Sequence, residues 1–371
     1  MKILKLIFIN IFFFYLLFSF LIFIIPYTYK FFNFFQNIQV SGKNFDQRSI
    51  LPNYNNIDWS SIHFDEISKL KTDYYDFIGW RRHDFNGETI NIKNGYRLNK
   101  NDNIISSLHV EFYGGSTLWG TGSDDKNTIP SIFERKSNLK TFNHGESGWW
   151  SRQSLSLKIN KSLNDSETKK LIIFYDGVNE VYHRCRNENF NISTNRQDQI
   201  RSKISNNSKF SLGYHLEPLL ELANLVRLKL FKNSNKNMNF YNCSSDPEKA
   251  KLVAIQMLEI WRNAKILSES KGNEFIAILQ PVAFVGSPEL KHLPYLEDMW
   301  PGLKNEYIRV YEEIMKNLQE YNDLNILDLK NAFDTNNTDG FIYIDFCHVS
   351  PNGNKIIVDL ILDYLKNKDL I

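Results

Sequence analysis

The chain has 371 residues, and its 44 Lys and Arg against 42 Asp and Glu leave a formal net charge of only +2. It is longer than a typical domain of about 100–200 residues and has ample sequence for a hydrophobic core. The near-neutral charge balance excludes the basic footprint expected of a nucleic-acid-binding protein, so no nucleic-acid partner is expected.

The N-terminal segment predicts a membrane anchor. Residues 6–25 carry no charge, and twenty helical residues at about 1.5 Å each span a hydrocarbon core of about 30 Å. Lys2 and Lys5 precede this run and aromatic residues follow it, which favours a cytoplasmic N-terminus. A cleavable signal peptide is the rival interpretation, but its apolar run is usually about 7–15 residues, and residues 24–27 offer no small-residue cleavage site. We therefore expect residues 1–29 to be a single-pass signal-anchor, with the remaining chain on the exported, periplasmic or extracellular side.

A linker and a small β-rich lead-in are expected over residues 30–105. This stretch is polar and aromatic, and turn signals at 85–87 and 93–95 flank the short alternating run 88–92.

Beyond residue 105, apolar strand-like runs alternate with helical patterns. The expected strands are 108–113, 139–143, 171–175, 275–279 and 325–329, and the expected helices are 129–135, 151–163, 247–271, 305–321 and 350–366. Because this alternation is typical of βαβ units, we predict an α/β fold over residues 106–371, with a five-stranded, mostly parallel sheet flanked by helices. A stretch rich in Asn, Ser, Lys and Arg at about 185–245 interrupts the alternation and is interpreted as an insertion.

The three cysteines allow one disulfide, which an exported compartment would permit. Cys185 and Cys243 are the favoured pair because both flank the insertion, whereas Cys347 lies in the candidate catalytic segment. The alternative, that all three stay reduced, is left open. No spacing typical of a zinc site occurs, so no metal is expected.

Chemistry-bearing residues follow the predicted strands, at the edge where the loops of a parallel sheet meet. A serine after two glycines follows the first strand, a glycine-containing loop follows the second, and an asparagine follows the third. An aspartate and a histidine three residues apart precede the last helix. In chain order the candidate site residues are Ser116, Gly148, Asn179, Asp345 and His348.

This ordered set resembles the SGNH (GDSL-type) hydrolase superfamily, whose four sequence blocks supply Ser, Gly, Asn and His. The match covers roughly residues 107–366 and implies a three-layer, flavodoxin-like fold. It also implies a catalytic triad of Ser116, His348 and Asp345. The oxyanion hole would be formed by the backbone of Ser116 together with Gly148 and Asn179.

The chemistry requires these residue types. A serine is a poor nucleophile until a base takes its proton, and histidine titrates in the range that suits this base. Asp345 would hold the imidazole of His348 in the productive tautomer, a role that a backbone carbonyl could fill instead. The N–H groups of the oxyanion hole would donate to the developing negative charge, where losing one donor typically costs about 100–1000-fold in rate.

Some assignments keep rivals. Gly145 competes with Gly148, Asn179 could cap the following helix, and Cys347 could replace Ser116 as nucleophile. Two positions depart from the family: Gly115 stands where the block usually has Asp, and Glu180 follows the asparagine where Asp is common. Both could alter loop rigidity or substrate choice.

Four tryptophans also bear on the site. Trp119, Trp149 and Trp150 lie close to it in sequence and could either stack on sugar rings or fill the core. Trp80 lies far from the four blocks, so we expect it to pack within the N-terminal lead-in.

The expected function is that of a membrane-anchored, exported serine esterase that removes an acyl group, such as acetyl, from a carbohydrate or another envelope polymer. An acyl-enzyme route needs no cofactor. Three alternatives stay open: an O-acyltransferase that uses the same serine on polysaccharide, a non-catalytic polysaccharide-binding or assembly module, and a lipid acylhydrolase.

Overall fold

The computed structural model describes residues 5–15, 46–99, 104–163, 168–186, 240–338 and 340–371. These residues fall into two compact units, of which one holds 5–15 and the other holds the rest. Residues 5–15 are helical, while the remainder of the predicted anchor lies outside the described residues. Within the part of the chain that the structure describes, no helix combines the length and apolarity needed to cross a membrane.

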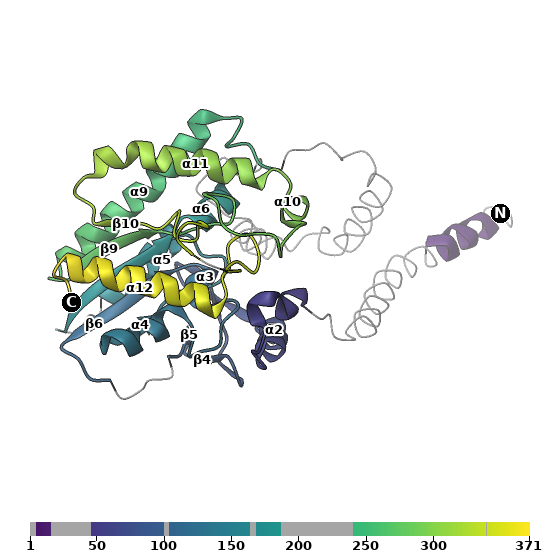
Figure 1. The fold of residues 1–371 in the computed structure, drawn as a ribbon. Coiled ribbons are helices and arrows are strands. Elements are labelled where there is room, and N and C mark those ends of the chain that lie inside the picture. The colour runs from purple at the N-terminus through teal and green to yellow at the C-terminus, as the bar shows by residue number, and fades with distance from the viewer. Residues whose placement is uncertain (1–4, 16–45, 100–103, 164–167, 187–239, 339) are drawn as a thin grey trace. The chain divides into compact units, whose positions relative to one another are not determined.

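A five-stranded parallel sheet forms the centre of the larger unit (Figure 1). Its strands are β6 (Leu108–Gly114), β7 (Lys140–Asn143), β8 (Lys169–Asp176), β9 (Glu274–Leu279) and β10 (Ile326–Asp328), in the order β10-β9-β8-β6-β7. Every neighbouring pair is parallel, so the predicted sheet is confirmed. Because β6 lies between β7 and β8, the strand order reverses there, and open α/β sheets bind ligands at such a switch point.

Helices cover both faces of this sheet (Figure 1). On one face α4 (Ile129–Ser137) packs against α12 (Pro351–Asn367), and on the other α9 (Pro247–Glu269) packs against α5 (Ser151–Ser162) and α11 (Leu303–Asn317). Short helices α3 (Ser116–Trp119), α6 (Val178–Arg184), α10 (Leu296–Met299) and η3 (Leu318–Tyr321) lie in the connections. The sequence marks the start of α9: Pro247 stands in its first turn, and Asp246 accepts a hydrogen bond from the N–H of Lys249.

The lead-in contains more helix than its sequence predicts. It begins with η1 (Gln47–Ile50), η2 (Pro52–Tyr54) and α2 (Ser60–Lys69). Two small antiparallel sheets follow: β1 (Thr72–Tyr75) with β2 (Gly79–Arg82), and β3 (Phe85–Asn86) with β4 (Asn91–Lys93) and β5 (Tyr96–Arg97). Ile90 and Ile92 form a buried cluster with Trp119, just after β6. The lead-in therefore shares one compact unit with the large sheet.

The predicted insertion at 185–245 lies largely outside the described residues. Its two ends are described and are joined by a disulfide between Cys185 and Cys243. The bridge links the end of α6 to the segment before α9.

Candidate active site

The two glycines before Ser116 allow the close packing that this turn requires. Gly114 ends β6 beside Tyr175 of β8, and a Cβ at this position would lie 2.5 Å from the carbonyl oxygen of Tyr175. A Cβ on Gly115 would collide with the side-chain nitrogen of Asn179. The space next to Gly115 is therefore occupied by Asn179, which would have to move if position 115 carried a side chain.

Ser116, His348 and Asp345 lie in a hydrogen-bonded row. The Oγ of Ser116 is 2.7 Å from Nε2 of His348, and Nδ1 of His348 is 2.6 Å from Oδ2 of Asp345. All three side chains are largely buried, with only 15% of the His348 side chain and 13% of the Asp345 side chain exposed. The structure thus brings Ser116 together with two residues that lie at least 229 positions later in the chain.

Asp345 is held as an ionised carboxylate. Its Oδ1 accepts the backbone N–H groups of Cys347 and His348 at 3.0 and 2.8 Å, and its Oδ2 accepts from Nη1 of Arg48 at 3.0 Å. Burial alone would raise the pKa of Asp345, but His348, Arg48 and the Cys347 N–H together hold that pKa well below its usual range. An ionised carboxylate can only accept, so Nδ1 of His348 carries the proton and Nε2 is free to accept the Ser116 hydroxyl proton.

Gly148 lies beside the row in an open loop position. Its φ is +75°, a conformation that favours glycine, and a Cβ there would find its nearest neighbour at 3.7 Å, on the ring of Trp80. The rival Gly145 is buried, and its Cβ would lie 2.7 Å from the backbone nitrogen of Trp119. Of the two glycines, Gly148 is the less buried and has the open space at its Cα, so it is the better candidate for the oxyanion hole.

Helix α6 binds the loop that contains Gly148 at three successive points. His183 donates from Nε2 to the carbonyl oxygen of Gly148 at 3.1 Å, and Asn179 donates from Nδ2 to that of Trp149 at 2.6 Å. Glu180 accepts the N–H of Ser151 at 2.7 Å and that of Gly177 at 2.9 Å. The departure at Glu180 therefore has a structural use, because its longer side chain joins the two loops. The sequence did not reveal the part played by His183.

Further polar contacts fix the loops on the two sides of Ser116. Thr117 donates from Oγ1 to the carbonyl oxygen of Cys347 at 3.1 Å and accepts from Nε2 of Gln280 at 2.8 Å. Gln280 follows β9 directly, so two hydrogen bonds join the ends of β6 and β9 to the loop before α12. These residues lay next to predicted strand ends, which is the only sequence signal that could have singled them out.

Three arginines of the lead-in contact the loops of this site. Arg48 reaches Asp345 as described above. Arg82 lies 3.3 Å from the buried carboxylate of Glu146, two residues before Gly148. Arg97 is fully buried, pairs with Asp125 at 2.9 Å, and donates to carbonyl oxygens of the turn that follows Ser116. None of the three was singled out from the sequence.

The tryptophans differ from expectation. Trp119, Trp149 and Trp150 are at most 1% exposed, so they fill the core and offer no face to a sugar. Trp80 lies at the site: its indole N–H donates to the carbonyl oxygen of Ser147 at 3.0 Å, and its own carbonyl accepts from Trp149. The expectation that Trp80 packs only within the lead-in is wrong, because β2 runs beside the loop of the second block.

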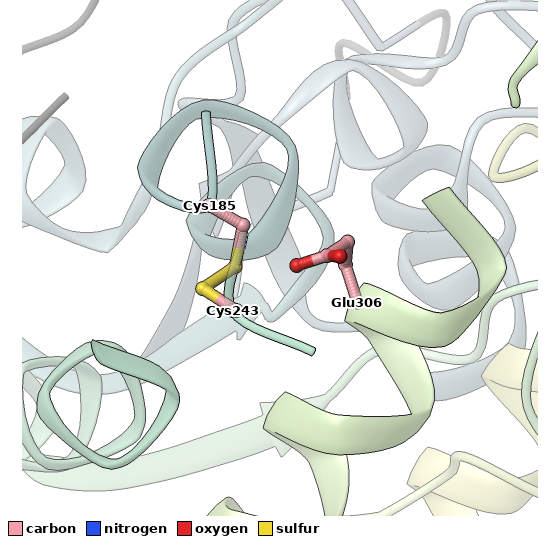
Figure 2. Close-up of side chains that lie close together, drawn as sticks. All are labelled: Cys185, Cys243 and Glu306. Carbon is pink, nitrogen blue, oxygen red and sulfur yellow. A yellow bond between two sulfur atoms is a disulfide. The ribbon is translucent and has the colours of Figure 1, made fainter. Parts of the chain in front are cut away.

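Among the residues that the structure describes, two groups of side chains lie close enough together to suggest a metal, and each has another explanation. Cys185 and Cys243 lie beside Glu306 (Figure 2), but the disulfide occupies both sulfur atoms, and Glu306 accepts from the N–H and hydroxyl of Ser244. Cys347 lies with Asp345 and His348. Burial raises the pKa of the Cys347 thiol well above its usual value, so it stays a neutral thiol. The hydroxyl of Ser116, and not this thiol, faces Nε2 of His348.

No protein-family model matches the chain, and no curated protein matches it in sequence. Solved structures similar to it include a lipolytic protein of the G-D-S-L family from Veillonella parvula, at 11% identity over 69% of this chain and 97% of that one, with a TM-score of 0.39. A carbohydrate acetylesterase from Sinorhizobium meliloti is 12% identical over 70% and 99% of the two chains, with a TM-score of 0.40. An acetyl xylan esterase is 12% identical over 69% and 98%, with a TM-score of 0.38. Of these three, the Veillonella parvula protein carries the G-D-S-L family name, and no activity is transferred to this chain from these similarities.

Proposed function

We propose that this chain is a serine esterase of the SGNH type that cleaves acyl esters through an acyl-enzyme on Ser116. The observation that carries the proposal is the row in which the Ser116 hydroxyl meets Nε2 of His348 at 2.7 Å while Nδ1 meets Asp345 at 2.6 Å. A binding module has no need of a base beside a hydroxyl, so this geometry favours catalysis over the non-catalytic alternative.

In the first step His348 takes the Ser116 proton at Nε2 as Oγ attacks the ester carbonyl. Asp345 stabilises the imidazolium that forms. His348 then gives the proton to the departing alcohol, and water repeats the sequence to release the acid. The site works without a cofactor in this scheme.

The oxyanion would be bound by the backbone N–H groups of Ser116 and Gly148 and by the Asn179 amide. That amide has two N–H bonds. One is directed at the Trp149 carbonyl, which fixes the amide plane beside Ser116, and the other remains for the oxyanion. The attachment of this loop to α6 keeps the donors in place before substrate arrives, as electrostatic stabilisation requires.

A carbohydrate or other envelope polymer that carries small acyl groups, such as acetyl, is the proposed substrate. Tyr182 and Trp300 are half-buried and pack against Phe346, which lies two residues before His348. Half-buried aromatic rings near the triad suit a sugar ring. The same chemistry serves acyl transfer when a sugar hydroxyl replaces water, and the experiment below separates the two.

The proposed location is the exported side of a membrane, with the N-terminal segment as anchor. The disulfide between Cys185 and Cys243 supports an oxidising compartment. The full chain is expected to stay with membranes after alkaline washing, whereas a chain beginning near residue 37 is expected to be released.

The test is hydrolysis of an aryl acetate and of an acetylated xylo-oligosaccharide by the wild-type chain and by Ser116→Ala. Acetate release by the wild type alone is expected. An excess of unacetylated oligosaccharide distinguishes transfer, because a transferase would move acetyl to it in preference to water. Equal rates for the two proteins would refute the proposal.

A further inference from the structure

Arg48 makes a contact with the site that crosses nearly the whole chain. Its Nη1 donates to Oδ2 of Asp345 at 3.0 Å, across 297 positions of sequence. The same oxygen lies 2.6 Å from Nδ1 of His348. Arg48 and His348 therefore bind one carboxylate oxygen from two directions.

Asp46 fixes the arginine in turn. It accepts from Nε of Arg48 at 3.0 Å through Oδ1 and from Nη2 at 2.8 Å through Oδ2, which is a two-point pair on one edge of the guanidinium. Asp46 also accepts the backbone N–H of Arg48 at 3.0 Å and caps η1. The ring of Phe64 lies 4.8 Å below the guanidinium carbon. With its plane and its edge both defined, the side chain leaves only Nη1 to point at Asp345.

Each oxygen of the Asp345 carboxylate has two hydrogen-bond partners. Oδ1 receives the backbone N–H groups of Cys347 and His348, and Oδ2 receives Arg48 and the imidazole. Three of these four partners, the two N–H groups and the His348 imidazole, come from the residue's own loop and cannot by themselves resist rotation of that loop. Arg48 is the contact that comes from a separate element, so it ties the loop to the lead-in.

We propose that Arg48, oriented by Asp46, is a positioning residue for the triad: it keeps the Asp345 carboxylate aimed at His348. This inference rests on the proposed function, because it assumes that the triad activates Ser116. It assigns part of the catalytic apparatus to a segment that precedes the matched region, 107–366.

The experiment compares full-length Arg48→Gln, Arg48→Lys and Asp46→Asn with the wild type, using an aryl acetate. For Arg48→Gln we expect kcat to fall about tenfold to a hundredfold with little change in KM, which corresponds to losing one hydrogen bond to a charged group. Arg48→Lys, which keeps the charge, should recover part of kcat, and Asp46→Asn should give a smaller loss than Arg48→Gln.

Arg309 provides a matched control. It contacts two carboxylates in α11, Glu313 at 3.0 Å and Glu312 at 3.9 Å, and its side chain is 33% exposed against 28% for Arg48. Arg309→Gln should change the melting temperature about as much as Arg48→Gln and leave kcat unchanged. Equal kcat in Arg48→Gln and the wild type, or equal losses in Arg48→Gln and Arg309→Gln, would overturn the proposal.

A second readout does not depend on turnover. In a chain labelled with nitrogen-15 at histidine, the Nδ1–H proton that His348 shares with Asp345 is identified by its absence in His348→Ala. Its resonance should shift or broaden in Arg48→Gln and stay in place in Arg309→Gln. An unshifted resonance in Arg48→Gln contradicts the positioning role. A shifted resonance in Arg48→Gln, beside a wild-type chain that cleaves no ester, contradicts only the proposed function.

Discussion

The large sheet and the lead-in contribute to the site in different ways. The sheet and its helices carry every group that we propose to take part in the chemistry, at loops that follow β6, β7 and β8 and at the loop before α12. The lead-in, residues 46–99, contributes side chains that hold those loops: Arg48 on the fourth block, Arg82 on the second and Arg97 on the first. The proposed reacting groups and the side chains that hold their loops therefore come from two regions that lie far apart in sequence but pack as one unit.

The largest effect should follow a change on the sheet side. Ser116→Ala removes the nucleophile, and in serine hydrolases such a loss costs up to about 10⁶-fold in kcat. Because the hydroxyl contributes little packing, the melting temperature should barely move. Steady-state hydrolysis measures kcat, and a thermal scan measures the melting temperature. If both fell together, Ser116 would support the fold, and the proposed division between chemistry and positioning would be wrong.

A change in the lead-in should show the reverse pattern. Arg97→Gln leaves Asp125 buried without its ion pair, since both side chains are at most 1% exposed, and breaking such a pair typically costs about 3–5 kcal/mol. Urea unfolding measures this loss. Arg262→Gln breaks an exposed pair with Glu259 and should cost at most about 1 kcal/mol. Similar losses of unfolding free energy in the two variants would show that the buried Arg97 pair stabilises the fold no more than an exposed pair does.

Asn179, the proposed oxyanion donor on α6, should have an effect between those of the two preceding changes. Asn179→Ala removes one donor and should lower kcat about 100–1000-fold. The alanine variant also loses the hydrogen bond to the Trp149 carbonyl. Asn179→Asp is the comparison, because it keeps the size of the side chain but replaces the donor with an acceptor. It should be as inactive as the alanine variant. Activity near that of the wild type in Asn179→Asp would exclude the donor role.

These predictions follow from a site of which only half was visible in the sequence. The strands and helices of the sheet were predicted to within a few residues, because apolar periodicity is strong in buried parallel strands and long helices. Ser116, Asn179 and His348 stood out because each follows or precedes such an element. Arg48, Arg82 and Arg97 lie in short, irregular segments with no period, and their partners are fixed only by tertiary packing.

The aromatic residues illustrate the same limit. Trp149 and Trp150 are next to Gly148 in sequence, yet both are buried, whereas distant Trp80 lies against this loop. Sequence distance from a motif therefore did not reveal that Trp80 contacts this loop. Glu180 was visible as a departure from the family pattern, but its two backbone partners depend on how α6 meets the start of α5.

The disulfide should contribute a smaller stabilisation than the Arg97 pair. It closes a separation of 58 residues between α6 and the segment before α9, and bridges of this kind typically stabilise by about 2–4 kcal/mol. Adding a reductant should lower the melting temperature of the wild type and leave that of the Cys185→Ser/Cys243→Ser double variant unchanged. An equal response in both would show that the bridge is absent from the folded chain.

The smallest expected effect is on acid stability. The pKa of Asp345 is lower in the folded chain than its ordinary value of about 4. Its ionised form therefore stabilises the fold above that value, and this contribution is lost as the pH falls below it. Between neutral pH and about pH 3, the melting temperature of Asp345→Asn should fall less steeply than that of the wild type. Parallel curves would indicate that the carboxylate is not held by Arg48 and His348 in solution.

The central claim, that Ser116 is an activated nucleophile, is tested most directly by intact mass and peptide mapping after exposure to a fluorophosphonate, beside His348→Ala. We predict one added group, located on Ser116 in the wild type and missing from the variant. A folded wild-type chain that takes up no label, or labels equally in both proteins, would contradict the claim.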